Sequence, residues 1–335
     1  MKKNLIPVFV TIAFVATVLL MRRNATVYQH DSGLVFGTSY NVTYQSRSNL
    51  KAEIERVLAE VDASLSPFND TSVITHVNRN EKVTLDGHFL AVFTLSSSVY
   101  DDTKGAFDIT VAPLVNAWGF GFKSGKQPDS RDIDSIMQFV GFDKVQLKAG
   151  RVEKKDPRVM LDCSAVAKGY GVDVVAKLLD SKGIDNYMVE IGGEIVTAGE
   201  NPKGAPWRIG VSKPDDDSLN VGKELQGVLN LTDKAMATSG NYRNFYYRDG
   251  KKYAHTIDPV NGYPVQHSIL SATVLADRCA VADAYATAFM VMGLDEAKAL
   301  LARRPDLMAY LIYSDESGKM KVWHSPSLKS NIEEQ

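Results

Sequence analysis

Two segments far apart in the chain constrain its fold most strongly, because their side chains suit one common site. The first covers residues 162–171, where an acidic turn leads into a predicted helix. The second contains Asp283 and Thr287, which stand four residues apart and therefore project from one face of a helix. Oxygen ligands that leave most positions of a cation open are typical of Mg²⁺ sites that also hold phosphate. We therefore expect a fold that brings the later helix against the earlier turn.

Each part of this pattern also has a plainer interpretation. The first helix, capped by Asp162 or Ser164, could present amides to an anion that Lys168 reaches, but a capped surface helix would have the same sequence. Asp283 lies among small and apolar residues, which indicates a buried carboxylate that must be paired or bind a cation. His255 precedes a predicted turn and could be a general base or a structural residue. The residues alone leave these alternatives open.

Two loop segments have alternative interpretations of the same kind. Residues 191–194 join two predicted strands, and we interpret their paired glycines as a tight hairpin turn rather than as a close approach to a ligand. Phe68 follows a proline in a predicted loop. It is either a core residue or a platform on which a flat ring could stack.

The composition excludes some classes of function. The 335 residues carry a formal net charge of -2, and no basic patch is interleaved with aromatic residues, so a nucleic-acid surface is not expected. Cys163 and Cys279 are the only cysteines. Their number and spacing fit neither a zinc site nor a disulfide framework. We expect two buried free thiols, with a single bridge between them as the alternative.

The N-terminus forms a separate segment. Two lysines precede an uncharged run over residues 5–21, and two arginines follow it. This pattern is typical of an export signal or a membrane anchor, and the run is near the lower limit of about 17 residues for a transmembrane helix. Because no clear cleavage site follows, we expect residues 1–23 to be an uncleaved anchor. Residues 24–33 are expected to be a short polar linker.

Hydrophobic periodicity predicts an α+β fold in which antiparallel strands mix with helices. Helices are predicted over residues 50–65, 89–100, 132–140, 280–291 and 295–302, and from the Asp162 turn to Lys182. Strands are predicted at 37–44, 159–161, 187–191, 195–198, 208–211, 228–231, 245–247, 270–275 and 308–313. Pro113 is expected to end the element that precedes it, and residues 248–250 are expected to form a hairpin turn.

Seven segments, taken in order, resemble the ApbE family of FAD:protein FMN transferases. Any one of them is a weak signal, but seven in the right order are specific, and they cover nearly the whole chain after the N-terminal segment. They are residues 36–40, 66–68, 105–115 with a continuation at 118–121, 162–171, 190–194, 255–259 and 282–287.

The resemblance implies a fold and an activity. The fold is a T-fold-like core with antiparallel sheets and packed helices, here over residues 34–330. The activity is transfer of the FMN half of FAD to a threonine hydroxyl of a target protein through a phosphoester, with release of AMP and with a divalent metal, usually Mg²⁺. The implied acceptors are subunits of Na⁺-pumping NADH:quinone reductase or of Rnf-type complexes. These act at the periplasmic face of a bacterial inner membrane, which agrees with the predicted anchor.

The resemblance also implies roles for the residues that match the family's motifs. The metal ligands would be Asp283, Thr287 and the backbone oxygen of Ala165. His255 would be the base toward the acceptor threonine. The cofactor-contact positions are Phe36, Phe68, Ala106, Phe107, Asp108, Asp162, Lys168 and Ile257.

Three departures from the family pattern matter. Ala286 stands where some members carry a second Asp, so the metal shell would hold an additional water. Phe68 lacks the hydroxyl of the family's Tyr, so stacking would survive but a polar contact would not. The lipid-attachment cysteine common in the family is missing, which favours a transmembrane anchor.

Two other functions fit a similar site. An FAD pyrophosphatase would split FAD into FMN and AMP with water as the acceptor. A membrane-tethered FAD-binding protein would hold FAD without catalysis. The combination of His255 with Asp283 and Thr287 argues against the second alternative, since a flavin reservoir needs no base.

Overall fold

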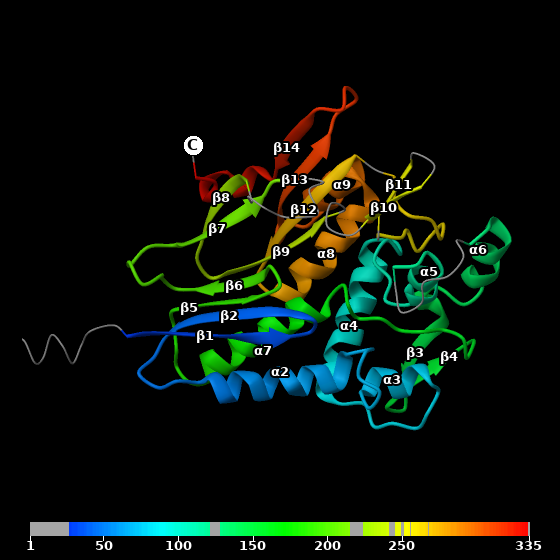
Figure 1. The fold of residues 1–335 in the computed structure, drawn as a ribbon, viewed down its shortest axis with the longest axis horizontal. Helices are drawn as coiled ribbons and strands as arrows, with labels where there is room; N and C mark the ends of the chain where they lie inside the picture. The colour runs from blue at the N-terminus through cyan, green and yellow to red at the C-terminus, as the bar shows by residue number, and fades with distance from the viewer. Residues whose placement is uncertain are drawn as a thin grey trace, which may run out of the picture.

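The core of the structure is one eight-stranded antiparallel sheet (Figure 1). This computed structural model describes residues 27–120, 128–214, 224–240, 245–248, 251–254, 256–266 and 268–333, so the predicted anchor over residues 1–23 lies outside the described residues. In spatial order the strands are β1 (Tyr28–Val35), β2 (Thr38–Gln45), β5 (Tyr187–Ile191), β6 (Glu194–Ala198), β9 (Lys234–Gly240), β12 (Ile269–Ala276), β13 (Met308–Ser314) and β14 (Met320–His324). All neighbouring pairs are antiparallel, which confirms the predicted fold class.

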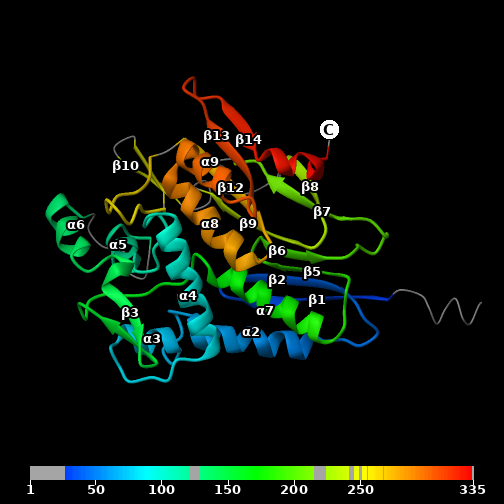
Figure 2. The same cartoon turned by 180° about the vertical axis from the view of Figure 1, so that it is seen from behind.

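Helices cover one face of this sheet. Helices α7 (Ala167–Ser181) and α8 (Cys279–Met292) pack directly on it, and α2 (Lys51–Leu65) and α4 (Gly87–Asp102) pack outside them (Figures 1 and 2). The other helices are α3 (Val73–Asn78), α5 (Ala112–Ala117), α6 (Ser130–Met137) and α9 (Leu294–Arg303), with 3-10 helices η1 (Phe142–Lys144) and η2 (Pro326–Asn331).

A second apolar layer covers the opposite face of the central strands. Ala235 and Ala237 of β9 belong to the clusters on the helical side, whereas Met236 between them belongs to a cluster with Trp207. Because side chains alternate along a strand, both faces of β9 are buried. The central strands are therefore packed on both faces, with α7 and α8 on one of them.

Three two-stranded hairpins surround the main sheet. They are β3 (Val145–Lys148) with β4 (Arg151–Lys154), β7 (Trp207–Ser212) with β8 (Leu225–Leu231), and β10 (Phe245–Arg248) with β11 (Lys251–Ala254). Arg248 pairs with Lys251 in the last hairpin. The expected hairpin is therefore present, although residues 249–250 of its turn lie outside the described residues.

The N-terminal boundary of the fold differs from the prediction. The predicted linker over residues 24–33 is wrong from Tyr28 onward, because β1 is an edge strand paired along its length with β2. Buried Asp31 helps to hold it, since its carboxylate accepts hydrogen bonds from the hydroxyl of Tyr44 (2.6 Å) and the amide of Asn49 (2.9 Å). Within the described ranges, every helix is too short or too polar to cross a membrane.

Two local predictions are wrong for identifiable reasons. Residues 159–161 do not form a strand, because the amide and the carbonyl of Leu161 bond to the side chain of Asn78 (2.7 and 2.9 Å). Pro113 does not end an element but lies in the first turn of α5. A proline is tolerated there, since the first amides of a helix have no partner within it.

The two cysteines are buried free thiols, as expected. Cys163 lies in the turn before α7, and Cys279 is the first residue of α8. Burial raises the pKa of both thiols, so both are protonated.

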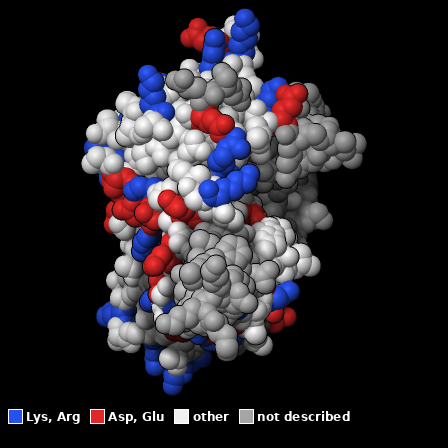
Figure 3. All heavy atoms as spheres, turned by 90° about the vertical axis from the view of Figure 1, so that its left-hand side faces the viewer, with Lys and Arg blue, Asp and Glu red and all other residues white. Residues whose placement is uncertain are grey.

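The outer surface carries both signs of charge. On the face shown in Figure 3, lysine and arginine side chains lie among aspartate and glutamate side chains. This mixture agrees with the small net charge of -2.

Candidate functional site

The two distant segments meet at one cavity of about 580 Å³. Asp162, Ala165 and Lys168 line it from the turn before α7 and from the start of that helix. Asp283 and Thr287 line it from α8. The central prediction is therefore confirmed: the later helix lies against the earlier turn, with a cavity between them.

Each of these two helices supplies a hydrogen-bond acceptor for the start of the other. Oδ2 of Asp283, in α8, accepts from the amide of Gly169 at the start of α7 (3.0 Å). Asp173, in α7, accepts from the amides of Cys279 (2.7 Å) and Ala280 (3.1 Å) at the start of α8. Carboxylates at helix N-termini satisfy amides that lack a partner and interact favourably with the helix dipole. We call these contacts the reciprocal caps.

The local cap predicted for the first helix is wrong. Asp162 accepts hydrogen bonds from the amide and the hydroxyl of Ser164 (2.8 and 2.5 Å), which closes a turn before the helix begins. Val166 is the N-cap residue and provides no side-chain acceptor. The acceptor comes instead from another helix, a contact that local spacing cannot reveal.

Ala165 lies beside the reciprocal caps and lines the cavity. It precedes the N-cap residue Val166, whose carbonyl accepts the first hydrogen bond of α7, from the amide of Tyr170 (3.0 Å). The amide of Gly169 is one of the first amides of the helix, which have no partner within it, and it donates to Asp283. Ala165, Asp283 and Thr287, the three residues predicted to supply oxygen ligands, thus line one cavity.

Gly169 permits the close contact of α7 with α8, and we expect Gly169→Ala to disrupt it. A Cβ at this position would lie 2.5 Å from the carbonyl oxygen of Cys279 and 2.8 Å from Cβ of Asp283. The free energy of unfolding should fall by about 1–3 kcal/mol, as is usual for overpacking. Gly87→Ala in α4 is the matched control, because a Cβ there meets nothing within 4 Å. Urea unfolding measures both variants, and equal midpoints would contradict the assigned contact.

An ion pair between a partly exposed lysine and a buried glutamate faces the same cavity. Nζ of Lys168 donates to Oε1 of Glu194 at 2.6 Å, and Glu194, the first residue of β6, is only 3% exposed. Burial alone would lower the pKa of Lys168, but Asp283 and Glu194 raise it, so the lysine is protonated. Burial and the nearby Asp283 raise the pKa of Glu194 to about 7. Burial also raises the pKa of Asp283.

The cavity has an excess of acidic groups. The described lining residues include one lysine, Lys168, and four carboxylates, those of Asp108, Asp162, Glu194 and Asp283. Buried charges require an opposite charge or coordination, and a divalent cation would provide both. The donors present suit Mg²⁺, which binds through one or two carboxylates together with other oxygens. No group of three His, Cys, Asp or Glu side chains in the described ranges could hold a metal by itself.

The loop that follows α4 forms another wall of the cavity. Phe107 and Asp108 line it, whereas Ala106 is buried beside Val265. This loop was expected to contact a cofactor through all three of its residues 106–108. The structure brings two of them to the cavity and places the third behind them.

The carboxylate of Asp108 also stabilises the conformation of this loop through hydrogen bonds. Oδ1 accepts from the amide and the hydroxyl of Thr110 (2.7 Å each), and Oδ2 accepts from the amide of Phe142 (3.0 Å). Burial raises the pKa of Asp108 to about 6. Both oxygens are thus engaged within the protein, so Asp108 shapes the cavity wall.

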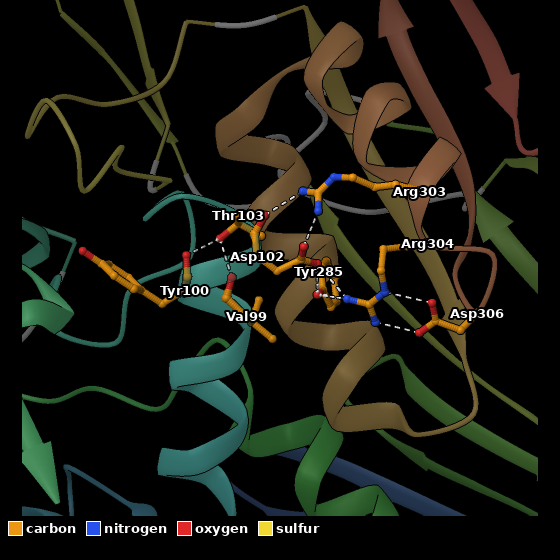
Figure 4. A network of polar contacts seen from close by, with 8 residues as sticks. All are labelled: Val99, Tyr100, Asp102, Thr103, Tyr285, Arg303, Arg304 and Asp306. Atoms are coloured by element: carbon orange, nitrogen blue, oxygen red, sulfur yellow. Dashed lines mark hydrogen bonds and ion pairs between the residues drawn. The ribbon is translucent and has the colours of Figure 1, made fainter.

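A polar network anchors the end of α4, from which this loop starts (Figure 4). Asp102 accepts from the hydroxyl of Tyr285 (2.5 Å) and from the guanidinium groups of Arg303 (2.5 Å) and Arg304 (2.7 Å). Tyr285 belongs to α8, between the two predicted metal ligands. The network therefore ties the loop to the helix that carries those ligands.

The two predicted aromatic contacts lie beside a second cavity of about 410 Å³, which shares Phe68, Ser164 and Lys168 with the first. Phe68 is 77% exposed, so its interpretation as a core residue is wrong. Phe36 lies in the turn between β1 and β2 and packs on α7, where a Cβ at Gly171 would lie 2.6 Å from its ring. Both aromatic residues thus face the second cavity.

The segment that was expected to carry the base is described only in part. Ile257 lines the first cavity together with Thr256 and Pro259, and it pairs with Pro264 in an isolated bridge. His255 lies outside the described residues, so its role remains a prediction.

Sequence reasoning missed three residues near this site, namely Asp173, Glu194 and Ser239. The hairpin predicted at residues 191–194 is present, but the carboxylate that follows its glycines also pairs with Lys168. Ser239 of β9 lines the cavity, with Oγ 3.2 Å from Oγ1 of Thr287. The signals for Glu194 are its position directly after two glycines, before a predicted strand, and its place in the segment 190–194 that resembles the family.

Comparisons with known proteins agree with this geometry. An FAD:protein FMN transferase of Vibrio cholerae is 37% identical over 311 residues, which cover 90% of this chain and 91% of that protein. One of Haemophilus influenzae is 35% identical over 333 residues, covering 94% and 95%. The solved structure of the flavin transferase ApbE from Vibrio cholerae matches with a TM-score of 0.82 and 35% identity, over 91% of this chain and 99% of that chain. The apo flavinyl transferase ApbE of Pseudomonas stutzeri gives 0.80 with 28% identity, over 91% and 97%.

The fold is therefore that of the flavin transferases. The sequence pattern that defines the ApbE family matches residues 36–312. This chain belongs to the ApbE family, which confirms the resemblance seen in its seven segments.

Proposed function

We propose that this chain transfers the FMN half of FAD to a threonine hydroxyl of a target protein. The threonine oxygen forms a bond to the FMN phosphorus, the bond from that phosphorus to the bridging oxygen breaks, and AMP leaves with the bridging oxygen. One observation carries the proposal: the hydrogen bond from Gly169 to Asp283 holds a buried carboxylate beside Lys168 in one cavity. The relatives named FAD:protein FMN transferase supply the reaction class.

The two adjoining cavities suit the shape of FAD, which has a flat ring system at each end and a diphosphate between them. Lys168 lines both cavities, so its ammonium group would face the diphosphate where they join. Phe36 and Phe68 would contact the isoalloxazine ring from the second cavity. Phe107 and Ile257 would contact the cofactor in the first.

A divalent cation, Mg²⁺, would be held by Asp283, Thr287 and the carbonyl of Ala165. When bound, it offsets the negative charge of the diphosphate and of the departing AMP. Three protein donors leave positions for phosphate oxygens and for water, which Mg²⁺ retains in such sites. Ala286 offers no ligand, so water would take the place of the second Asp of other family members.

The protein's own groups would perform the remaining tasks. Glu194 holds the ammonium group of Lys168, which stays protonated and stabilises negative charge near the reacting phosphorus. His255 would accept the proton of the incoming threonine hydroxyl, which makes that oxygen nucleophilic. Asp108 would keep the loop wall in place through its hydrogen bonds to Thr110 and Phe142.

The setting of the reaction follows from the N-terminal sequence. Residues 1–23 would anchor the enzyme in the inner membrane, with the transferase domain on the periplasmic face. The acceptors would be subunits of Na⁺-pumping NADH:quinone reductase or of Rnf-type complexes, which present their flavin-carrying threonines at that face. An anchored enzyme and a membrane-bound acceptor would then share one surface.

Incubation of the full-length protein with FAD, Mg²⁺ and a threonine-bearing acceptor subunit tests the proposal. We expect a fluorescent acceptor band on a denaturing gel, a mass increase that corresponds to FMN, and one AMP for each labelled acceptor. An acceptor whose threonine is replaced by alanine is the control. Free FMN without labelled acceptor would indicate an FAD pyrophosphatase, and unchanged FAD would indicate a membrane-tethered FAD-binding protein. Either result would contradict the proposal.

A further inference from the structure

The carboxylate of Glu194 uses only one of its two oxygens in hydrogen bonding. Oε1 accepts from Nζ of Lys168. Oε2 is buried and has no hydrogen-bond partner among the described residues, although the side chain lines the cavity together with Asp283. A buried, unpaired carboxylate oxygen is uncommon, because loss of hydration without a new partner is unfavourable. We therefore expect a bound species to contact this oxygen.

The amides of Gly192 and Gly193 do not provide that partner, and the hydrogen bond of the Glu194 amide to its own carboxylate does not reach Oε2. The amide of Gly193 donates to Glu190 (2.8 Å), and the amide of Gly192 donates to the carbonyl of Ser39 (3.0 Å). Lys168, the one lysine among the described lining residues, is bound at Oε1. The partner of Oε2 is therefore expected to come from a molecule or ion that enters the cavity.

The charge of the cavity indicates the sign of this partner. Glu194 and Asp283 are both buried carboxylates at this cavity, and Lys168 is the one lysine among its described lining residues, so it can offset only one of the two charges. A phosphate oxygen would add negative charge beside Oε2. A cation, or a water molecule polarised by a cation, has the required sign.

We propose that Glu194 is a second acidic partner of the divalent cation: Oε2 accepts a hydrogen bond from a water molecule bound to the ion, while Oε1 holds Lys168. This inference rests on the cation site of the proposed function. Mg²⁺ keeps several of its waters in proteins. Groups that contact a metal's ligands typically change metal affinity by roughly 10–100-fold. Glu194 would thus link the two positive groups that receive the diphosphate.

Binding of Mn²⁺ in the absence of flavin, measured by the EPR signal of the free ion, tests this role independently of catalysis. In the full-length protein, Glu194→Gln should raise the Mn²⁺ Kd by about tenfold or more. Lys168→Met removes a competing positive charge, so it should leave the Mn²⁺ Kd unchanged or lower it while weakening FAD binding. Glu200→Gln, an exposed carboxylate just beyond β6, is the control and should change neither affinity.

The different effects expected for Glu194→Gln and Lys168→Met distinguish a contact of Glu194 with the metal's water from a role in holding Lys168 alone. If Glu194→Gln binds Mn²⁺ like the wild type but loses affinity for FAD, then Glu194 acts only by holding Lys168, and the proposal is overturned. Glu194→Gln alone removes the charge that pairs with the partly buried Lys168, so the double variant Lys168→Met/Glu194→Gln guards against misfolding. It should bind Mn²⁺ more weakly than Lys168→Met alone, and equal affinities would overturn the proposal.

The same titration distinguishes this inference from the proposed function. A wild-type protein that binds Mn²⁺ in a Glu194-dependent manner but labels no acceptor would support the role of Glu194 and contradict FMN transfer. A wild-type protein that labels the acceptor but binds no Mn²⁺ without flavin would overturn the role of Glu194 and leave FMN transfer standing.

Discussion

Replacement of Asp283 by alanine should abolish FMN transfer, with a loss of at least about 10³-fold in rate, the upper end of the effect expected when one stabilising group is removed from an active site. The substitution removes three interactions at once. The amide of Gly169 loses its acceptor, the cation loses its only carboxylate ligand among the assigned three, and Lys168 loses one of the two carboxylates that raise its pKa. FAD binding should also lose most of its dependence on Mg²⁺.

The rate of acceptor labelling and the FAD affinity with and without Mg²⁺ measure this effect. Asp277→Ala is a suitable control, because the Asp277 side chain is exposed just before α8 and pairs with Lys234 at the surface. Asp283→Asn removes the negative charge but keeps an oxygen that can accept the hydrogen bond from Gly169, so it distinguishes the role of the charge from that of the cap. Full transfer activity in Asp283→Ala would remove the cation site from the proposed function.

His255→Ala should retain FAD binding but lose transfer by about 10²–10⁴-fold, the usual contribution of a general base. The threonine hydroxyl would then have to lose its proton to water, whereas the contacts to FAD assigned to Lys168, Phe36 and Phe107 would be unchanged. The loss should therefore appear in kcat and hardly in the Kd for FAD.

Single-turnover labelling of the acceptor, alongside FAD titration followed by flavin fluorescence, separates these two quantities. His30→Ala is the control, since His30 is exposed on edge strand β1, away from the cavity, and its ring nitrogen hydrogen-bonds to Thr43. Normal labelling by His255→Ala would refute the role as a base. Failure of this variant to bind FAD would also refute it, because the residue would then belong to the cofactor site.

The sequence predicts those parts of the site whose residues are neighbours in the chain. Asp283 and Thr287 are one helical turn apart, so their common face follows from the period of the helix. The place of Lys168 at the start of α7 follows in the same way. The reciprocal caps do not, because Asp173 and Asp283 act on helices far away in the sequence. Glu194 is recognised as a site residue by its contact with Lys168, which depends on β6 lying beside α7.

The same distinction explains the fold. Alternating and helical periodicities locate those strands and helices that bury one face, such as β2 and α2, whereas short apolar runs mark the central strands, which are buried on both faces. The errors arise where a distant side chain replaces a local backbone partner. Asn78 takes both backbone groups of Leu161, which would otherwise have extended into a strand. Tyr28 begins a strand because β2 is available beside it, although its own sequence is polar.

The reciprocal caps have a consequence for the order in which the chain is made. A ribosome that has synthesised α7 has produced a helix whose first turn still lacks its acceptor, and this acceptor arrives only with α8, after most of the sheet has been translated. Because α8 also lines the cavity, the cavity is complete only after this late helix has docked on α7.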